Sequence, residues 1–241
     1  MNNALLIARR ELSAYLSSFL GFAVLAAVLL VEGLYFNAVG ISTTARLSSD
    51  VLREFFYTIS GGTMILAVVL AMRLLAGERE HGTLVLLNTA PVKDSEIVAG
   101  KFLAALGLLS LHLALTVYMP LLVMVNGKVT TGHVLVGYAG VLLLGAAALA
   151  IGMFGSALAR NQIIAVVIGV VLLAVFILWW MVARVTDPPL NTFLSGLAIH
   201  HERQRPFMTG VLRLENVVYY LGVAYFFLLA ATKTLEARRW R

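Results

Sequence analysis

Long apolar runs separated by short polar segments constrain this chain more than any other feature. A helix of about 20 apolar residues crosses the hydrocarbon core of a bilayer. Inside that core a helix satisfies its own backbone polar groups. The sequence therefore predicts an all-α membrane protein, a single domain over residues 1–241 with six transmembrane helices. The predicted spans are residues 19–39, 55–75, 97–125, 133–158, 163–182 and 216–231.

Composition agrees with a membrane protein. The chain is 61% hydrophobic and 12% charged, whereas soluble domains carry about 25% charged residues. It has no cysteine, which excludes disulfides and thiolate metal sites. Its net charge of +6 is explained by the basic cytoplasmic loops of membrane proteins. We therefore expect membrane lipid around the chain and no nucleic-acid partner.

The basic residues also orient the chain. With the N-terminus inside, the predicted cytoplasmic segments hold 11 of the 18 lysines and arginines, and the outer segments hold 7. Basic residues close to span ends favour the cytoplasmic side. We therefore expect both termini and residues 76–101 to be cytoplasmic.

Two polar regions flank the spans at the membrane surface. Residues 1–17 predict an amphipathic interfacial helix, with leucines at roughly helical spacing; the alternative is a plain lead-in to the first span. Residues 184–215 predict an outer interfacial segment whose short helix stops at Pro206. This segment holds His200, His201 and Glu202, but adjacent histidines point in different directions on a helix and the HExxH pattern is absent. We therefore predict no metal site.

The longest charged segment between two spans is residues 76–101. An apolar face with Leu84 and Leu87 predicts a short amphipathic helix, and Pro91 breaks whatever helix follows. Asp94 or Ser95 can then cap a new helix. This arrangement suits docking onto another protein; the alternative is a solvated loop.

Few polar residues interrupt the spans. Glu32 is an acid inside the first span, and an intramembrane carboxylate suggests function by default. The alternative is that water or a neighbouring polar group satisfies it. We expect His112 to serve packing and hydrogen bonding, the Gly61-Gly62 pair to mark close packing or a bend, and Arg73 to reach the lipid phosphates.

Motifs for chemistry are absent from the sequence. There is no G-x-x-x-x-G-K-[ST] loop, no G-x-S-x-G elbow and no pair of catalytic groups at one depth in the spans. We therefore predict no catalytic residue and no cofactor in this chain. Nearly apolar spans also argue against a small carrier for ions or polar solutes.

The charged segment resembles a known motif. Residues 78–92, EREHGTLVLLNTAPV, followed by IVAGK at 97–101, resemble the signature loop of type-2 ABC exporter permeases. The C-terminal stretches FMTGV, ENVVYY and EARRW are similar to the gliding-motility subfamily of these permeases. Two positions depart from the family pattern, since members often carry an acid at Val85 and an apolar residue at Asn88.

The resemblance implies a transmembrane permease subunit of an ATP-driven exporter in the bacterial inner membrane. Residues 76–96 would form a cytoplasmic coupling region whose helix docks onto a separate ATP-binding subunit, which would hold ATP and Mg. The implied docking residues are Glu78, Arg79, Glu80, Gly82, Thr83, Leu84, Leu87 and Pro91.

The resemblance also implies a dimer, formed with a second copy or a homologous subunit, with the pathway between the two. Glu32, Gly61 and Gly62 would then lie at the translocation or dimer axis. The alternative is a complex that does not transport and instead passes a conformational signal to envelope partners, including an accessory protein.

Overall fold

The computed structural model describes residues 3–40, 46–83 and 91–239. All regular secondary structure in these residues is helical. Within these described residues, six helices are long and apolar enough to cross a membrane, which confirms the predicted fold class. These candidate spans are Gly21–Ala38, Ser48–Glu80, Asp94–Val125, Thr131–Leu158, Gln162–Arg184 and Leu214–Arg238.

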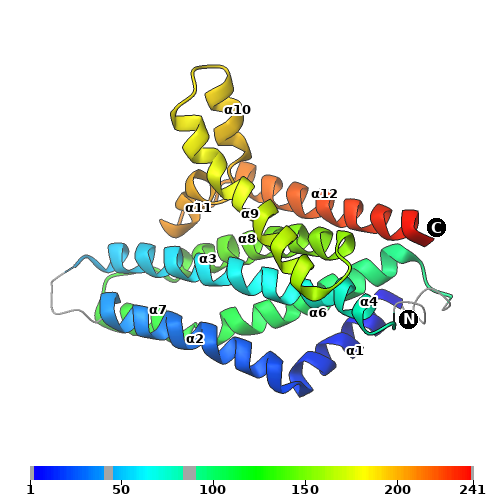
Figure 1. Cartoon of the computed structure of the whole chain (residues 1–241). Coiled ribbons are helices and arrows are strands. Elements are labelled where there is room, and N and C mark those ends of the chain that lie inside the picture. Colours follow the sequence, from blue (N-terminus) through cyan, green and yellow to red (C-terminus); the bar gives the residue numbers. More distant parts are fainter. Residues whose placement is uncertain (1–2, 41–45, 84–90, 240–241) are drawn as a thin grey trace.

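The helices follow one another with short connections, and Figure 1 shows their arrangement. Both termini lie at the same end of the bundle as α4 (Figure 1). In chain order the elements are α1 (Asn3–Ser17), α2 (Phe19–Gly40), α3 (Ser48–Met72), a π-helical segment η1 (Arg73–Gly77), α4 (Glu78–Glu80), α6 (Asp94–Leu115), α7 (Tyr118–Asn126), α8 (Thr131–Leu158), α9 (Gln162–Arg184), α10 (Leu190–Leu197), α11 (His201–Met208) and α12 (Leu214–Arg239).

Helix α8 forms the centre of the bundle and packs against α3, α9 and α12. Its glycines allow this close approach. An added Cβ at Gly152 would lie 2.7 Å from Cβ of Ala71, and one at Gly145 would lie 2.8 Å from Cγ2 of Thr63. Small residues at such crossings let the backbones of membrane helices meet.

The predicted third span is two helices. Helix α6 ends at Leu115 and α7 begins at Tyr118. Pro120 lacks an N–H and its ring clashes with the carbonyl four residues earlier, so a continuous helix cannot pass Thr116. The hydroxyl of Thr116 donates to the carbonyl of Leu113 at 2.7 Å.

The predicted helix over residues 1–17 is present as α1. It crosses α6 where a Cβ at Gly100 would lie 2.7 Å from the carbonyl oxygen of Ala4. Leu5, Leu6 and Leu16 stay exposed. Its place in the lipid interface remains a prediction.

The outer segment predicted at 184–215 contains two helices, α10 and α11. In Figure 1, α9 extends beyond the bundle and α10 folds back beside it. Pro206 does not stop the first of these helices, because α10 already ends at Leu197 and Pro206 lies inside α11. The prediction was wrong because it treated two helices as one.

Candidate functional site

The C-terminal end of α3 changes from α-helix to π-helix at η1. A π turn shifts the backbone hydrogen bonds and frees groups that an α-helix would use internally. Ser156 of α8 supplies partners for them. Its hydroxyl accepts from the N–H of Leu75 at 3.2 Å and of Ala76 at 2.9 Å, and donates to the carbonyl of Met72 at 3.3 Å. Nothing in the sequence assigns Ser156 a hydrogen-bonding role, although it is the one hydroxyl-bearing residue in the Gly- and Ala-rich stretch 145–158.

Directly after η1, Glu78 meets a buried lysine. The ammonium of Lys101 on α6 donates to the carboxylate of Glu78 at 2.7 Å and to that of Glu11 on α1 at 3.0 Å. The side chain of Lys101 is only 1% exposed. We call Lys101, Glu11 and Glu78 the Lys101 junction, because it fastens α1, α4 and α6 together.

Sequence reasoning missed this junction. Glu11 was not singled out within residues 1–17, and Lys101 appeared only as the last residue of the IVAGK motif. The available signal was a single lysine inside the apolar start of a span, since a buried ammonium requires acidic partners.

The next two charged residues bind the α8–α9 loop. Arg79 donates to the carbonyl of Ala157 at 3.4 Å and also to that of Ala159. The carboxylate of Glu80 accepts from the N–H of Gln162 at 3.1 Å. Glu78, Arg79 and Glu80 are therefore each bonded within the chain. Their predicted contacts with a partner protein remain predictions.

A glycine ends α4. Gly82 has φ +72°, its N–H donates to the carbonyl of Arg79 at 3.2 Å, and the N–H of Thr83 donates to that of Glu78 at 2.9 Å. These two bonds form a Schellman motif, in which glycine suits the left-handed position. The hydroxyl of Thr83 also donates to the carboxylate of Glu78. The predicted docking residues Leu84 and Leu87 lie outside the described residues.

The chain re-enters the bundle after Pro91, which is exposed. Neither Asp94 nor Ser95 is the N-cap of α6, because the helix starts at Asp94 and Lys93 precedes it. Glu96 satisfies this end instead, since its carboxylate accepts from the N–H of Lys93 at 3.0 Å. An acid three residues into a helix commonly bonds the backbone of the capping residue.

A cavity of about 710 Å³ lies beside the Lys101 junction. The guanidinium of Arg73 is placed 5.6 Å from the ring centre of Tyr15, so Arg73 lies over an aromatic ring of α1. The residues lining the cavity come from α1, η1, α4 and the start of α9, and include Arg10, Glu11, Tyr15, Arg73, Glu78, His81 and Gln162.

A second polar site lies in the interior of the bundle. Glu32 is 4% exposed and His112 is 0% exposed, with Oε2 of Glu32 3.4 Å from Nε2 of His112. A Cβ at Gly62 would collide with the carboxylate of Glu32, whereas a Cβ at Gly61 would meet nothing within 4 Å. The structure thus brings Glu32 and Gly62 together, joins them to His112, and places Gly61 beside open space.

A third buried base, His200, lies between α10 and α11. Nε2 of His200 is hydrogen-bonded to Oγ of Ser60 at 2.7 Å. Burial lowers the pKa of His200 to about 4, and the neighbouring His201 adds to this effect. This bond fastens the segment before α11 to α3.

A family model described as "ABC-2 family transporter protein" matches residues 48–231, more than half of the chain. No curated protein matches the chain. The matched range begins at the first residue of α3 and includes the charged segment and both elements of the outer segment.

Proposed function

Since this chain belongs to the ABC-2 transporter family, as a permease subunit of an ABC transporter, we propose that it couples ATP hydrolysis to substrate movement across the membrane. A separate ATP-binding subunit would hold ATP and Mg and hydrolyse the nucleotide. The permease would dock onto that subunit through its charged segment.

The bonding of Glu78, Arg79 and Glu80 carries this proposal. Glu78 is bonded to Lys101 of α6, which also donates to Glu11 of α1. Arg79 is bonded to the residue that follows α8, and Glu80 to the start of α9. A force applied to the loop that follows them would reach four helices at once. A charged and apolar loop with a firmly bonded base is what a coupling element needs.

The proposal has further features that accompany membership of this family. We expect export, a dimer with a second copy or a homologous subunit, and the bacterial inner membrane. The end that holds both termini and α4 (Figure 1) would face the cytoplasm. The C-terminal stretches FMTGV, ENVVYY and EARRW support placing the chain near the gliding-motility subfamily.

A second candidate function is signal transmission without transport. The α9–α10 pair supports it, because this pair stands out from the side of the bundle (Figure 1) and offers a surface for a partner protein. Under this proposal the ATP-binding subunit would drive the same movement, but an accessory protein would receive it.

Co-purification from the native host in mild detergent tests the docking claim. We expect a stoichiometric ATP-binding subunit and ATPase activity, both lost in Leu84→Asp. Val85→Asp is the matched control on the same stretch, because related permeases often carry an acid there. Glu78 is unsuitable for this test, since changing it also breaks the Lys101 junction. A wild-type chain that purifies alone and shows no ATPase activity would refute the proposal.

A further inference from the structure

Helix α2 presents an acid at the centre of its buried face. Its inward positions are Leu25, Glu32 and Phe36, which recur at helical spacing, while most of its other side chains are exposed. Among the other spans α2 packs chiefly on α3. A leucine at position 32 would serve packing better, so the carboxylate requires another explanation.

Several buried polar atoms of α2, α3 and α6 have unused hydrogen-bonding capacity. Both carboxylate oxygens of Glu32, Oγ1 of Thr63 and both ring nitrogens of His112 are buried without a hydrogen-bond partner among the described residues. The 3.4 Å contact between Glu32 and His112 is within ion-pair distance but lacks hydrogen-bond geometry. Each buried polar group left in this state costs about 1–3 kcal/mol, so a small polar ligand is expected.

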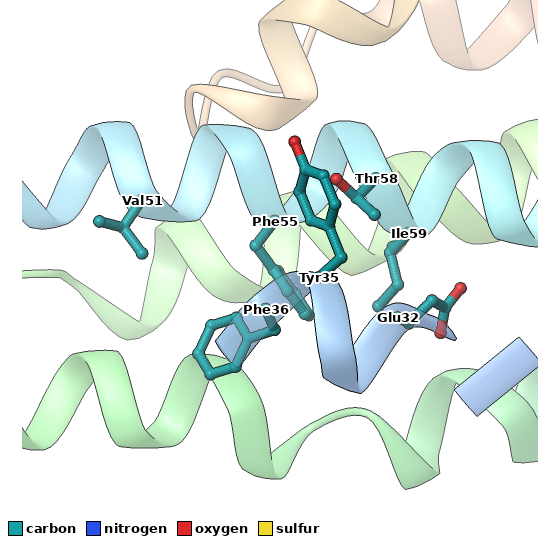
Figure 2. A pocket seen from close by; sticks show the side chains of 7 residues that line it. All are labelled: Glu32, Tyr35, Phe36, Val51, Phe55, Thr58 and Ile59. Carbon is teal, nitrogen blue, oxygen red and sulfur yellow. The ribbon is translucent and has the colours of Figure 1, made fainter. Parts of the chain in front are cut away.

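A hollow beside Glu32 has room for such a ligand. Its volume is about 10 Å³, and Figure 2 shows Glu32 and Thr58 at its border together with the rings of Tyr35, Phe36 and Phe55. A water molecule needs a cavity of about 10–15 Å³ and two to four polar partners. The hollow offers the carboxylate and the Thr58 hydroxyl, and Glu32 connects it to His112.

We propose that Glu32 and Thr58 bind a water molecule inside the membrane and that this hydrated site, together with the contact between Glu32 and His112, is an openable fastening for α2. Ordered water completes the hydrogen bonds that the side chains do not make with one another. Replacing a buried ion pair by apolar residues is often neutral or stabilising. The Glu32–His112 pair therefore adds little to stability. Its role is instead to let α2 separate from the bundle and return.

Hydroxyl-radical labelling by X-ray pulses in H₂¹⁸O tests the hydration, with the chain in lipid nanodiscs. Bound water generates radicals locally and labels the side chains beside it. Phe36 and Phe55, 7% and 5% exposed, should be labelled severalfold more than Phe227, which is 6% exposed and packs among aromatic rings elsewhere. Because the three exposures match, equal labelling of all three would overturn the proposal.

A double-mutant cycle tests the role of the pair. Glu32→Leu and His112→Leu should each lower the melting temperature, because each leaves one buried ionisable group unpaired. The combined variant should return to the wild-type value or exceed it, and should lose the labelling at Phe36. A combined loss equal to the sum of the two single losses would refute the pairing.

Spin labels test whether the fastening opens. The natural chain has no cysteine, so labels attach only to cysteines introduced at the exposed Leu30 of α2 and Leu111 of α6. Electron–electron distance measurements should give a broader distribution in the wild-type background than in the Glu32→Leu/His112→Leu background. Identical distributions would show that α2 is equally fixed in both and would overturn the proposal.

A variant with two amide side chains tests the water site even if the leucine variants misfold. Glu32→Gln with His112→Gln keeps a hydrogen-bonding group at both positions and removes both ionisable groups. This variant should retain the labelling of Phe36 and Phe55, because water binds through the hydrogen-bonding groups. Loss of the label in a folded protein would overturn the water site.

Discussion

Two buried basic residues on the same face of α6 differ in how well their side chains are hydrogen-bonded. Lys101 and His112 lie about three helical turns apart, with side chains 1% and 0% exposed. Lys101 donates to two carboxylates at hydrogen-bonding distance, whereas His112 has one acid at 3.4 Å and no hydrogen bond among the described residues. The difference indicates a fixed joint near the end of the bundle that holds both termini and a loose one in its middle.

Replacing Lys101 is the strongest way to break the fixed joint. Lys101→Met should lower the free energy of unfolding by about 3–5 kcal/mol, because it leaves two carboxylates without their buried partner. Thermal unfolding in detergent measures the change. Lys233→Met is the control, since Lys233 is 68% exposed in its pair with Glu236 and should change stability by less than about 1 kcal/mol. Equal losses of stability in the two variants would mean that the Lys101 junction does not hold α1, α4 and α6 together.

Ser156 tests the same end of the molecule without touching a charge. Ser156→Ala should cost about 2–3 kcal/mol, because the N–H groups of Leu75 and Ala76 lose their acceptor. Unfolding by denaturant or heat reports the loss. Ser110→Ala is a matched control, since the Ser110 hydroxyl only donates to Leu106 in its own helix. A loss at position 110 as large as that at 156 would contradict the role of Ser156.

His200 adds a third buried base to the comparison, and its effect on stability depends on pH. Its pKa falls from 6.5 to about 4 because of burial, so the unfolded chain takes up its proton at higher pH than the folded chain. The stability it contributes is fully present above pH 6.5 and is lost as the pH falls toward 4. At pH 5 the loss should be about 2 kcal/mol. The difference in melting temperature between pH 7 and pH 5 should shrink in His200→Gln; an unchanged difference would assign the pH effect to another group.

Gly62 and Gly61 give the smallest and most local test of the loose joint. Gly62→Ala should cost about 1 kcal/mol, since its methyl group would collide with the flexible end of Glu32 and displace it. Gly61→Ala should be neutral or slightly stabilising, because its methyl group enters open space in a helix. Melting temperatures of the two variants measure this, and a larger loss at position 61 would contradict the placement of Glu32.

The sequence predicted what depends on runs of neighbouring residues. Hydropathy located all six candidate spans, although it placed the start of the second at residue 55 where α3 begins at Ser48. The reason is that hydropathy reports the part that suits lipid, whereas polar helix ends continue beyond it. The break before Tyr118 was predictable from Pro120 but was not drawn from it.

Pairing between distant helices could not be predicted in the same way. Glu32 and His112 were each singled out as unusual, but nothing in their spacing joins one to the other. The same holds for Lys101 with Glu11, and for Ser156 with η1. Such contacts depend on which helix faces meet, and that is fixed by packing over the whole bundle rather than by any local pattern.

The π turn at η1 also determines the direction in which the side chains after it point. Each residue of an α-helix advances the side-chain direction by about 100°, and a π turn accommodates one extra residue. Everything beyond Gly77 is therefore rotated relative to the face that α3 presents to the bundle. Removing one residue from η1 would leave the composition of the charged segment almost unchanged, yet it would aim Glu78, Arg79 and Glu80 at the wrong neighbours together. The orientation of the whole segment thus depends on the one extra residue that the π turn accommodates.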